Sequence, residues 1–518
     1  HKETNSYMHR KMSDIQHGTT DKQNLMILIG LTTGFTNSNM MANTALRGGL
    51  LGYLIAYILS YILIGVPLLY MEIIVGQFTG RDCIKVWKIR PFLSHVGYVL
   101  VLWQIFILIQ QHQMACFVNY YMLLSFETPI PFHHCGDWAD ETCDIMNNNY
   151  TVHHKCVKSD EKEDYCESIY TTFPEFQFWR YRLLNLVEDF HVEYRVCISS
   201  FILCSLMFIC CFKRMVSLKF FLPFLSIYPI VGNVLILIGS MTQEGSVNKF
   251  REIMDTTFEI FVTRHRMSVS IFHVIQALKL GTGLVFSWSS SFSFRSPCYS
   301  LTIISIVFSI LYTLLSLCTT ALMICPYAHQ ANTFPKNIFI ESPLSLFYEK
   351  VPIILKMYVY EHFWLFVFYS SNFVLGLRTN IIIYFSLLEL LFTRYKILAK
   401  YSESVCMIGL VCLFLVTIPF FGTFGITMLG GGQQRSANAA GVLLCVVECV
   451  TFLLFYGIDR IAQDVHFMLG IKPKICIKFL WLTSLFTLGY ALVQELIHYG
   501  CLRIIYPINF GVFVLINV

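Results

Sequence analysis

Charged side chains are scarce in this chain of 518 residues, because Asp, Glu, Lys and Arg together make up only 13% of it. Hydrophobic residues make up 56%, and the mean hydropathy is +0.60. So few charges exclude a series of soluble domains, which would need a largely polar surface. The composition therefore predicts a polytopic membrane protein in which one integral domain accounts for nearly the whole chain.

The sequence also lacks the motifs of several function classes. It shows nothing typical of a catalytic triad, a phosphate-binding loop or a nucleic-acid-binding module, so we expect neither an enzyme nor a nucleic-acid partner. Residues 1–23 have no apolar core of the signal-peptide kind, and we expect them to form a cytoplasmic tail before a transmembrane domain at 24–518. The net charge of +5 is concentrated in loops, where it indicates topology.

About a dozen apolar runs are present, and a helix needs roughly 20 apolar residues to span a bilayer. Short basic segments separate them, such as 81–90, 213–219 and 394–400, and the positive-inside rule places these segments and both termini in the cytoplasm. The runs predict an all-α protein in the lipid bilayer with helices at about 25–45, 48–75, 96–126, 196–211, 220–240, 269–292, 301–324, 363–392, 405–421, 433–456 and 479–497, and a short or truncated twelfth helix.

Glycine and polar residues interrupt two of these runs at mid-membrane depth. The first contains Gly30, Gly34 and Asn37, and the second contains Gly281 and Gly283. In membrane transporters such breaks expose backbone carbonyls and helix ends to a substrate or ion near the bilayer midplane. One break in each half suggests an inverted repeat, whereas the alternative is a pair of glycine-rich helices that pack closely.

A single long hydrophilic segment, residues 127–194, carries features of an extracellular loop. Asn149 begins an Asn-Tyr-Thr sequon and is predicted to be glycosylated. Four cysteines there fit an oxidising compartment, and four cysteines allow three pairings. A zinc site is the competing interpretation, since histidines are nearby. The residues concerned are Cys135, Cys143, Cys156 and Cys166, with His133, His134, His153 and His154.

Several local strings resemble the neurotransmitter:sodium symporter family. The stretch 65–78, GVPLLYMEIIVGQF, is similar to the helix 2 signature of that family, and further matches follow in family order at Cys135 to Cys143, at Cys298 and at 455–460. The resemblance covers the chain from Leu25 onward. It implies about 12 transmembrane helices in a LeuT-type 5+5 inverted repeat with broken helices 1 and 6. It also implies a Cys135–Cys143 disulfide, which leaves Cys156 to pair with Cys166 by elimination.

The family further implies transport of an amino-acid-like solute by alternating access at the plasma membrane, with sodium and chloride as ions and no other cofactor. The substrate positions implied are Thr32, Gly34, Gln111, Gly281, Gly283 and Ser287. Those of the first sodium are Thr32, Asn37 and Ser309, and those of the second are Gly30, Thr33, Leu375, Arg378 and Thr379. The chloride positions are Tyr57, Thr313 and either Gln276 or His273.

This sequence departs from the family at charged positions. The outer-gate arginine of the family falls on Met40, its acidic partner falls near Gln433, and the second sodium site holds Arg378. A guanidinium stays protonated, and about 4 Å from a sodium ion it would repel the ion by roughly 4 kcal/mol at an effective dielectric of 20. We therefore predict that Arg378 replaces sodium on the oxygens of Gly30 and Thr33, unless helix 8 is rotated so that Arg378 faces a watery inner vestibule.

Two functions from different classes follow. The first is a secondary-active or facilitative transporter that is largely independent of sodium, with Lys279 as a second cation near the cavity. Gly34 stands where amine transporters carry an aspartate, so amino-acid carriers are the better match. The second is a non-transporting relative that acts as a receptor or as a partner of another membrane protein. Lost gate charges favour the second function, whereas the broken helices, Asn37, Tyr57 and Glu72 favour transport.

Overall fold

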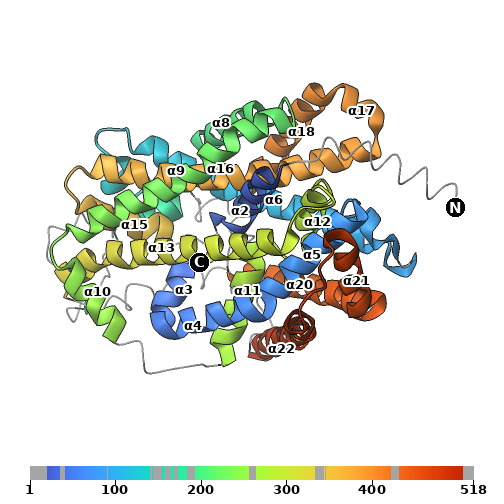
Figure 1. The fold of residues 1–518 in the computed structure, drawn as a ribbon. Coiled ribbons are helices and arrows are strands. Elements are labelled where there is room, and N and C mark those ends of the chain that lie inside the picture. The colour runs from blue at the N-terminus through green and yellow to red at the C-terminus, as the bar shows by residue number, and fades with distance from the viewer. Residues whose placement is uncertain are drawn as a thin grey trace, which may run out of the picture.

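Long helices form nearly all of the computed structural model (Figure 1). It describes residues 20–35, 41–89, 91–140, 143, 155–157, 165–167, 173–183, 193–255, 264–332, 344, 346–421 and 431–505. Within that part of the chain, nine helices are long and apolar enough to cross a membrane. Helices 1 and 6 are too short for that criterion because they are broken, and 506–518, where a twelfth helix was predicted, lie outside the described residues. The twelve-helix inverted repeat therefore stays a prediction.

The unbroken spans agree closely with the apolar runs of the sequence. The second span is built from three pieces, α4 (Leu50–Ser60), the π-helix η3 (Tyr61–Gly65) and α5 (Val66–Thr79). The others are α6 (Val96–Leu124), α8 (Tyr194–Cys211), α9 (Met215–Met241), α13 (Cys298–Gln330), α16 (Glu361–Arg394), α18 with η11 (Ser402–Thr417, Ile418–Phe421), α20 with η12 and α21 (Gly431–Cys449, Val450–Gly457, Ile458–Leu469) and α22 (Ile475–Ile505). Three ends differ clearly. Helix α13 continues through Pro326 instead of ending at Ile324, α21 continues the tenth run to Leu469 instead of ending at Tyr456, and α22 reaches Ile505 instead of ending at Ile497.

Both predicted helix breaks are present. The first helix, α2 (Asp21–Thr32), ends at an extended Thr33, and the chain becomes helical again in α3 (Met41–Gly48). The second broken helix consists of α11 (Arg264–Leu278) and α12 (Leu284–Ser289). Between them Lys279, Gly281 and Gly283 have φ values of 55°, 65° and 76°. This left-handed conformation suits glycine but is uncommon for lysine.

The broken helices lie inside a cage of long helices. In Figure 1, α9, α13 and α16 run across the molecule, and α2 packs against all three. The other break is held close to α5, since a Cβ atom on Gly76 would lie 2.9 Å from the carbonyl oxygen of Phe286 in α12. This approach is possible only because glycine lacks a side chain.

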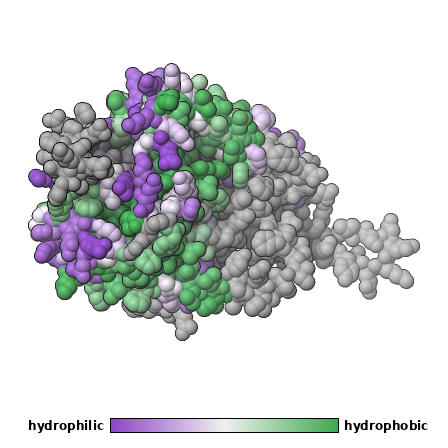
Figure 2. Space-filling model, turned by 90° about the vertical axis from the view of Figure 1, so that its right-hand side faces the viewer, coloured by the Kyte–Doolittle hydropathy of each residue, from purple (hydrophilic) through white to green (hydrophobic). Residues whose placement is uncertain are grey.

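Large apolar side chains are exposed on the outer helix faces, as expected of a protein in lipid. On α9, for example, Val216 and Phe220 are exposed. Figure 2 shows the end of the molecule near α17 (Lys396–Lys400) and α21, where hydrophilic patches interrupt the hydrophobic surface. That end contains the basic segments that the positive-inside rule places in the cytoplasm.

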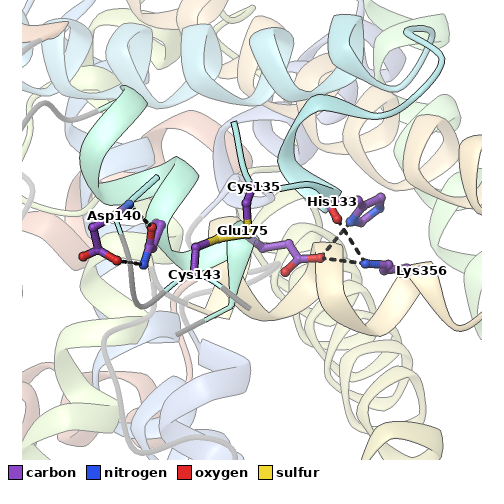
Figure 3. The surroundings of a disulfide bond; sticks show 7 residues. His133, Cys135, Asp140, Cys143, Glu175 and Lys356 are labelled. Carbon is purple, nitrogen blue, oxygen red and sulfur yellow. Dashed lines mark hydrogen bonds and ion pairs between the residues drawn. A yellow bond between two sulfur atoms is a disulfide. The ribbon is translucent and has the colours of Figure 1, made fainter. Parts of the chain in front are cut away.

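The hydrophilic loop after α6 is tied to the helices by polar contacts. The predicted disulfide between Cys135 and Cys143 is confirmed (Figure 3). Beside it the carboxylate of Glu175, in α7 (Pro174–Gln177), lies 2.8 Å from His133 Nδ1 and 3.7 Å from Lys356 Nζ. Lys356 ends α15 (Val351–Lys356), so this cluster joins two loops that are distant in sequence. Asn149 lies outside the described residues.

A two-stranded hairpin in the same loop bears on the second pair of cysteines. Strands β1 (Lys155–Val157) and β2 (Tyr165–Glu167) are antiparallel, with Cys156 directly opposite Cys166. Opposite residues of an antiparallel pair have Cα atoms about 4.5–5.5 Å apart, which falls within the range of disulfides. The backbone register is thus compatible with the predicted disulfide, which itself stays a prediction.

We expect non-reducing peptide mapping of the loop 127–194 to yield a peptide pair linked through Cys156 and Cys166. The reason is their register in the hairpin. The Cys135–Cys143 linkage serves as the positive control in the same digest. Recovery of Cys135 linked to Cys156 would contradict the predicted connectivity.

Candidate functional site

The candidate site lies where the two broken helices meet. Helix α11 contacts α2, and α12 contacts both α2 and α16. Backbone groups that a break releases have no water to bind in the bilayer, so other groups must satisfy them. The following contacts show which groups do so.

Side chains from α5 and α6 hold the break between α11 and α12. The N–H of Gly281 donates to Glu72 Oε1 at 2.9 Å, and Gln104 Nε2 donates to the carbonyl of Thr282 at 2.8 Å. Within the break, Thr282 Oγ1 donates to the carbonyl of Lys279 at 2.6 Å. Helices α5 and α6 therefore fix the unwound segment, and α20 is the third element that contacts it, since Gly281 lies against Cys445.

Glu72 has a second buried partner. Its carboxyl group lies within hydrogen-bonding reach of that of Glu448 in α20, and both side chains are buried. Two carboxyl groups share a hydrogen bond only when at least one of them carries a proton. We define Glu72 and Glu448 as the carboxyl pair, which carries at most one negative charge.

Three tyrosines four residues apart line one face of the second span. Tyr57 OH lies 3.1 Å from Tyr61 OH and 3.3 Å from Thr313 Oγ1, and the Tyr53 hydroxyl contacts His273 Nδ1. The structure thus brings together the two chloride positions Tyr57 and Thr313. His273 contacts this row through Tyr53. Gln276, the alternative to His273, is half-buried one turn further along α11.

Two positions of the first sodium site are in direct contact. Ser309 Oγ donates to the carbonyl of Thr32 at 2.7 Å, and Tyr61 OH lies 2.9 Å from the same serine oxygen. A protein hydroxyl therefore binds the carbonyl that an ion would otherwise use. Asn37, the third position, lies outside the described residues.

Arg378 of α16 contacts the end of α2. Its Nη2 donates to the carbonyl of Thr33 and, at 2.7 Å, to Thr33 Oγ1. The predicted bond to Gly30 does not occur in the described contacts, where Gly30 meets Arg378 through the aliphatic Cδ. The reason is positional, since Gly30 lies within α2 whereas Thr33 follows its last residue. Of the remaining positions, Thr379 Oγ1 donates to the Leu375 carbonyl at 3.0 Å.

The predicted substrate positions divide into two groups. Gly34 lies beside Thr379, because a Cβ atom on the glycine would be 3.6 Å from Thr379 Oγ1. Gln111 is half-buried, and its carbonyl accepts a 3.2 Å hydrogen bond from Asn380 of α16. Gly34 and Gln111 thus lie beside α16, and Thr32 is the last residue of α2. Gly283 and Ser287 both lie against Cys83, in the segment between α5 and α6, and Gly281 lies against Cys445 of α20, so these three form the second group.

Sequence reasoning missed Glu448, Gln104 and Tyr61. Two of them carried a usable signal. Glu448 is the one charged residue in the apolar run 441–457, and an intramembrane acid usually has a functional partner. Tyr61 continues the four-residue spacing of Tyr53 and Tyr57, which places all three on one helix face.

Aromatic residues cover the breaks on the side of the disulfide loop. The π-helix η10 (Leu346–Lys350) contributes Tyr348, whose ring stacks on Trp179 with 4.2 Å between centroids. Tyr348 OH also donates to the Met114 carbonyl of α6 at 3.4 Å. The ring of Phe347 packs against that of Phe35, which lies in the first break, with 5.3 Å between the ring centroids.

A hydrogen-bond network of amide, hydroxyl and backbone groups, with one carboxylate, covers the opposite side. Gln77 Nε2 of α5 donates to the carbonyls of Ser293, Phe294 and Ser296, at 2.9, 3.2 and 3.0 Å. Ser296 Oγ in turn donates to Asp21 Oδ1 at 2.6 Å, at the start of α2. We call this the Gln77 network. It joins the first turn of α2 to the chain that follows α12.

Comparisons with known proteins identify the family of the chain. The model of the sodium:neurotransmitter symporter family matches residues 18–513. The chain is 22% identical over 448 residues to the sodium- and chloride-dependent glycine transporter 1 of Xenopus laevis, covering 80% of this chain and 68% of that protein. It is 22% identical over 425 residues to the sodium-dependent serotonin transporter of Drosophila melanogaster, with 80% and 66% covered.

A third relative is the sodium- and chloride-dependent neutral and basic amino acid transporter B(0+) of Homo sapiens, 23% identical over 448 residues, with 80% of this chain and 68% of the relative covered. The chain thus spans about two thirds of the length of these relatives. Members of the matched family are multi-pass membrane transporters and not enzymes. From the family match over nearly its whole length, the chain belongs to the sodium:neurotransmitter symporter family as a divergent member.

Proposed function

We propose that this chain carries amino-acid-like small solutes across the plasma membrane by alternating access, without coupling to the sodium gradient. The observation that carries the proposal is the contact of Arg378 Nη2 with the carbonyl and hydroxyl of Thr33. Those oxygens end the first half of broken helix 1, where the family resemblance implies the second sodium ion.

Electrostatics makes the arginine and a sodium ion alternatives. At about 4 Å and an effective dielectric of 20, two unit positive charges repel by roughly 4 kcal/mol, which lowers affinity by about a thousandfold. Arg378 is only 2% exposed, so solvent screens this repulsion little. A sodium ion at Thr33 would have to displace the guanidinium first.

The fixed cation can do part of the work of a bound ion. It holds α2 against α16, as an ion between the two helices would. Being covalently attached, it cannot cross the membrane with the solute, so the sodium gradient has no means of driving transport at this site. Facilitated transport or exchange is the consequence.

The solute class follows from the relatives and from one position in this chain. Two of the three relatives are named for amino-acid substrates, one for glycine and one for neutral and basic amino acids. Gly34 lies beside Thr379 and offers no carboxylate for an amine. We assign Thr32, Gly34, Gln111, Gly281, Gly283 and Ser287 to the solute.

The chloride site and the first sodium site that the family resemblance implies each keep part of their ligands. Tyr57, Tyr61 and Thr313 present clustered hydroxyl groups that suit a chloride ion. Ser309 and Thr32 retain contact at the first sodium site, but the serine hydroxyl already occupies the carbonyl. We therefore propose that chloride has a better site here than sodium has.

A second candidate function is a non-transporting relative that acts as a receptor or as a partner of another membrane protein. The observation that favours it is that protein donors already occupy the carbonyls of both Thr32 and Thr33. A chain locked by such contacts could keep the fold without moving a solute.

Uptake into proteoliposomes separates these functions. We expect saturable uptake of labelled amino acids that is unchanged when choline replaces all sodium, because Arg378 takes the place of the second sodium ion. Protein-free liposomes give the background, and a sodium-coupled family member gives the positive control for sodium dependence. Uptake that collapses in choline would contradict sodium independence, and no uptake in either buffer would favour the non-transporting relative.

A further inference from the structure

Lys279 lies in the break of helix 6, one of the two breaks that form the candidate site. It is only 5% exposed and has a left-handed backbone with φ of 55°. Its N–H donates to the Gln276 carbonyl at 3.4 Å, and its own carbonyl accepts from Thr282. The backbone of Lys279 is thus held in place at both its N–H and its carbonyl.

The ammonium of Lys279 has no such partner among the residues that the structure describes. Within this same part of the chain, the other buried charges fall into two classes. Glu175, Glu193 and Glu349 each have a cationic side chain within 4 Å, namely Lys356, Arg182 and Arg180. Glu72 and Glu448 lie against each other as the carboxyl pair. The remaining buried charges are Lys279 and Arg378, and neither forms an ion pair with a described carboxylate.

These two cations are not equivalent. Nη2 of Arg378 is committed to Thr33, and its role is to hold α2. Lys279 is free of such a contact, and a buried cation without an anion is costly. A small zwitterion brings one positive and one negative charge and therefore cannot balance an additional cation. A solute with one further carboxylate can.

We propose that the transported solute is an acidic amino acid and that Lys279 binds its side-chain carboxylate, an inference that rests on the proposed transport function. Lys279 is then the residue that determines charge specificity. The solute's other carboxylate and its amine are common to all amino acids and therefore do not determine this preference. Chloride is the alternative anion, and the experiment includes it.

The test measures binding of labelled L-glutamate and L-glutamine to the purified full chain. The two solutes have nearly the same shape and differ in the charge of one group. We expect wild-type protein to bind glutamate more tightly. Lys279→Met should weaken glutamate binding roughly tenfold to a hundredfold and leave glutamine binding unchanged, because a charged hydrogen bond is lost. Lys279→Arg should keep most of the preference. Lys472→Met removes an exposed lysine and is the matched control.

Each other outcome has a definite meaning. Preference of the wild type for glutamine, or an unchanged preference in Lys279→Met, would overturn the inference while leaving amino-acid transport intact. Equal binding of glutamate and glutamine in chloride, with a glutamate preference that appears only when gluconate replaces chloride, would show that Lys279 holds chloride, and would also overturn it. If no amino acid of either charge binds or is taken up, the proposed function itself fails. Should Lys279→Met not fold, competition of aspartate against asparagine on the wild type decides between the same outcomes.

Discussion

Replacing Arg378 by aspartate should convert sodium-independent uptake into uptake that requires sodium. The substitution removes the guanidinium from Thr33 and puts a carboxylate on α16 at a position where the family has a sodium ligand. The carbonyl and hydroxyl of Thr33 then become available, and an ion satisfies them in place of the two charge-assisted bonds, each of which contributes about 1.5–3 kcal/mol. Uptake measured against sodium concentration should change from flat to saturable.

Two controls define this experiment. Arg394→Asp makes the same change of charge at the exposed end of the same helix and should leave uptake flat. Arg378→Ala removes the cation without supplying a ligand, and we expect it to lose transport in either buffer because nothing ties α2 to α16. If Arg378→Ala transports like the wild type, the arginine does not hold the helix, and its position in the site has no functional meaning.

Replacing Glu72 by alanine should destabilise the folded protein by about 2–4 kcal/mol. The alanine leaves the buried N–H of Gly281 without an acceptor and Glu448 without its partner. The measurement is thermal unfolding of the purified chain in detergent, followed by intrinsic fluorescence, together with uptake.

Glu72→Gln is the matched variant, because it differs from the wild type in charge but not in shape. Its amide oxygen still accepts from Gly281, and its NH2 group still donates to Glu448. We expect it to retain most of the stability that alanine loses. Equal losses in Glu72→Gln and Glu72→Ala would mean that the negative charge, and not the hydrogen bonding, holds the break.

Much of the fold could be predicted from the sequence, because lipid imposes local rules. A run of apolar residues must be helical, so span ends such as Val96 and Cys211 were correct. The breaks were predictable for a similar reason, since glycine and polar residues at mid-membrane depth do not continue a lipid-exposed helix. Pro326 misled the prediction of one end because the surrounding protein tolerates a proline inside α13.

The contacts inside the site were harder to predict. Residue types and the family resemblance pointed to Thr33 as a partner of Arg378. That Gly30 is not a second partner depends on where α2 ends, and the sequence does not predict this end to within one turn. The carboxyl pair joins residues that are far apart in sequence, and no periodicity along the chain encodes that contact. The same is true of Tyr348 against Trp179, which depends on how a loop folds back over α6.

The Gln77 network has a consequence for how the protein responds to its ionic surroundings. The amide of Gln77 is neutral and binds backbone carbonyls, so dissolved salt does not screen these bonds as it screens exposed ion pairs, whose range is about 8 Å at 0.15 M ionic strength. The positive-inside rule predicts that this end faces the cytosol, and changes of salt concentration there should therefore weaken these bonds of Gln77 very little. In a cell whose internal salt concentration varies, a glutamine at this position would keep the contact between α5 and the chain after α12 equally stable.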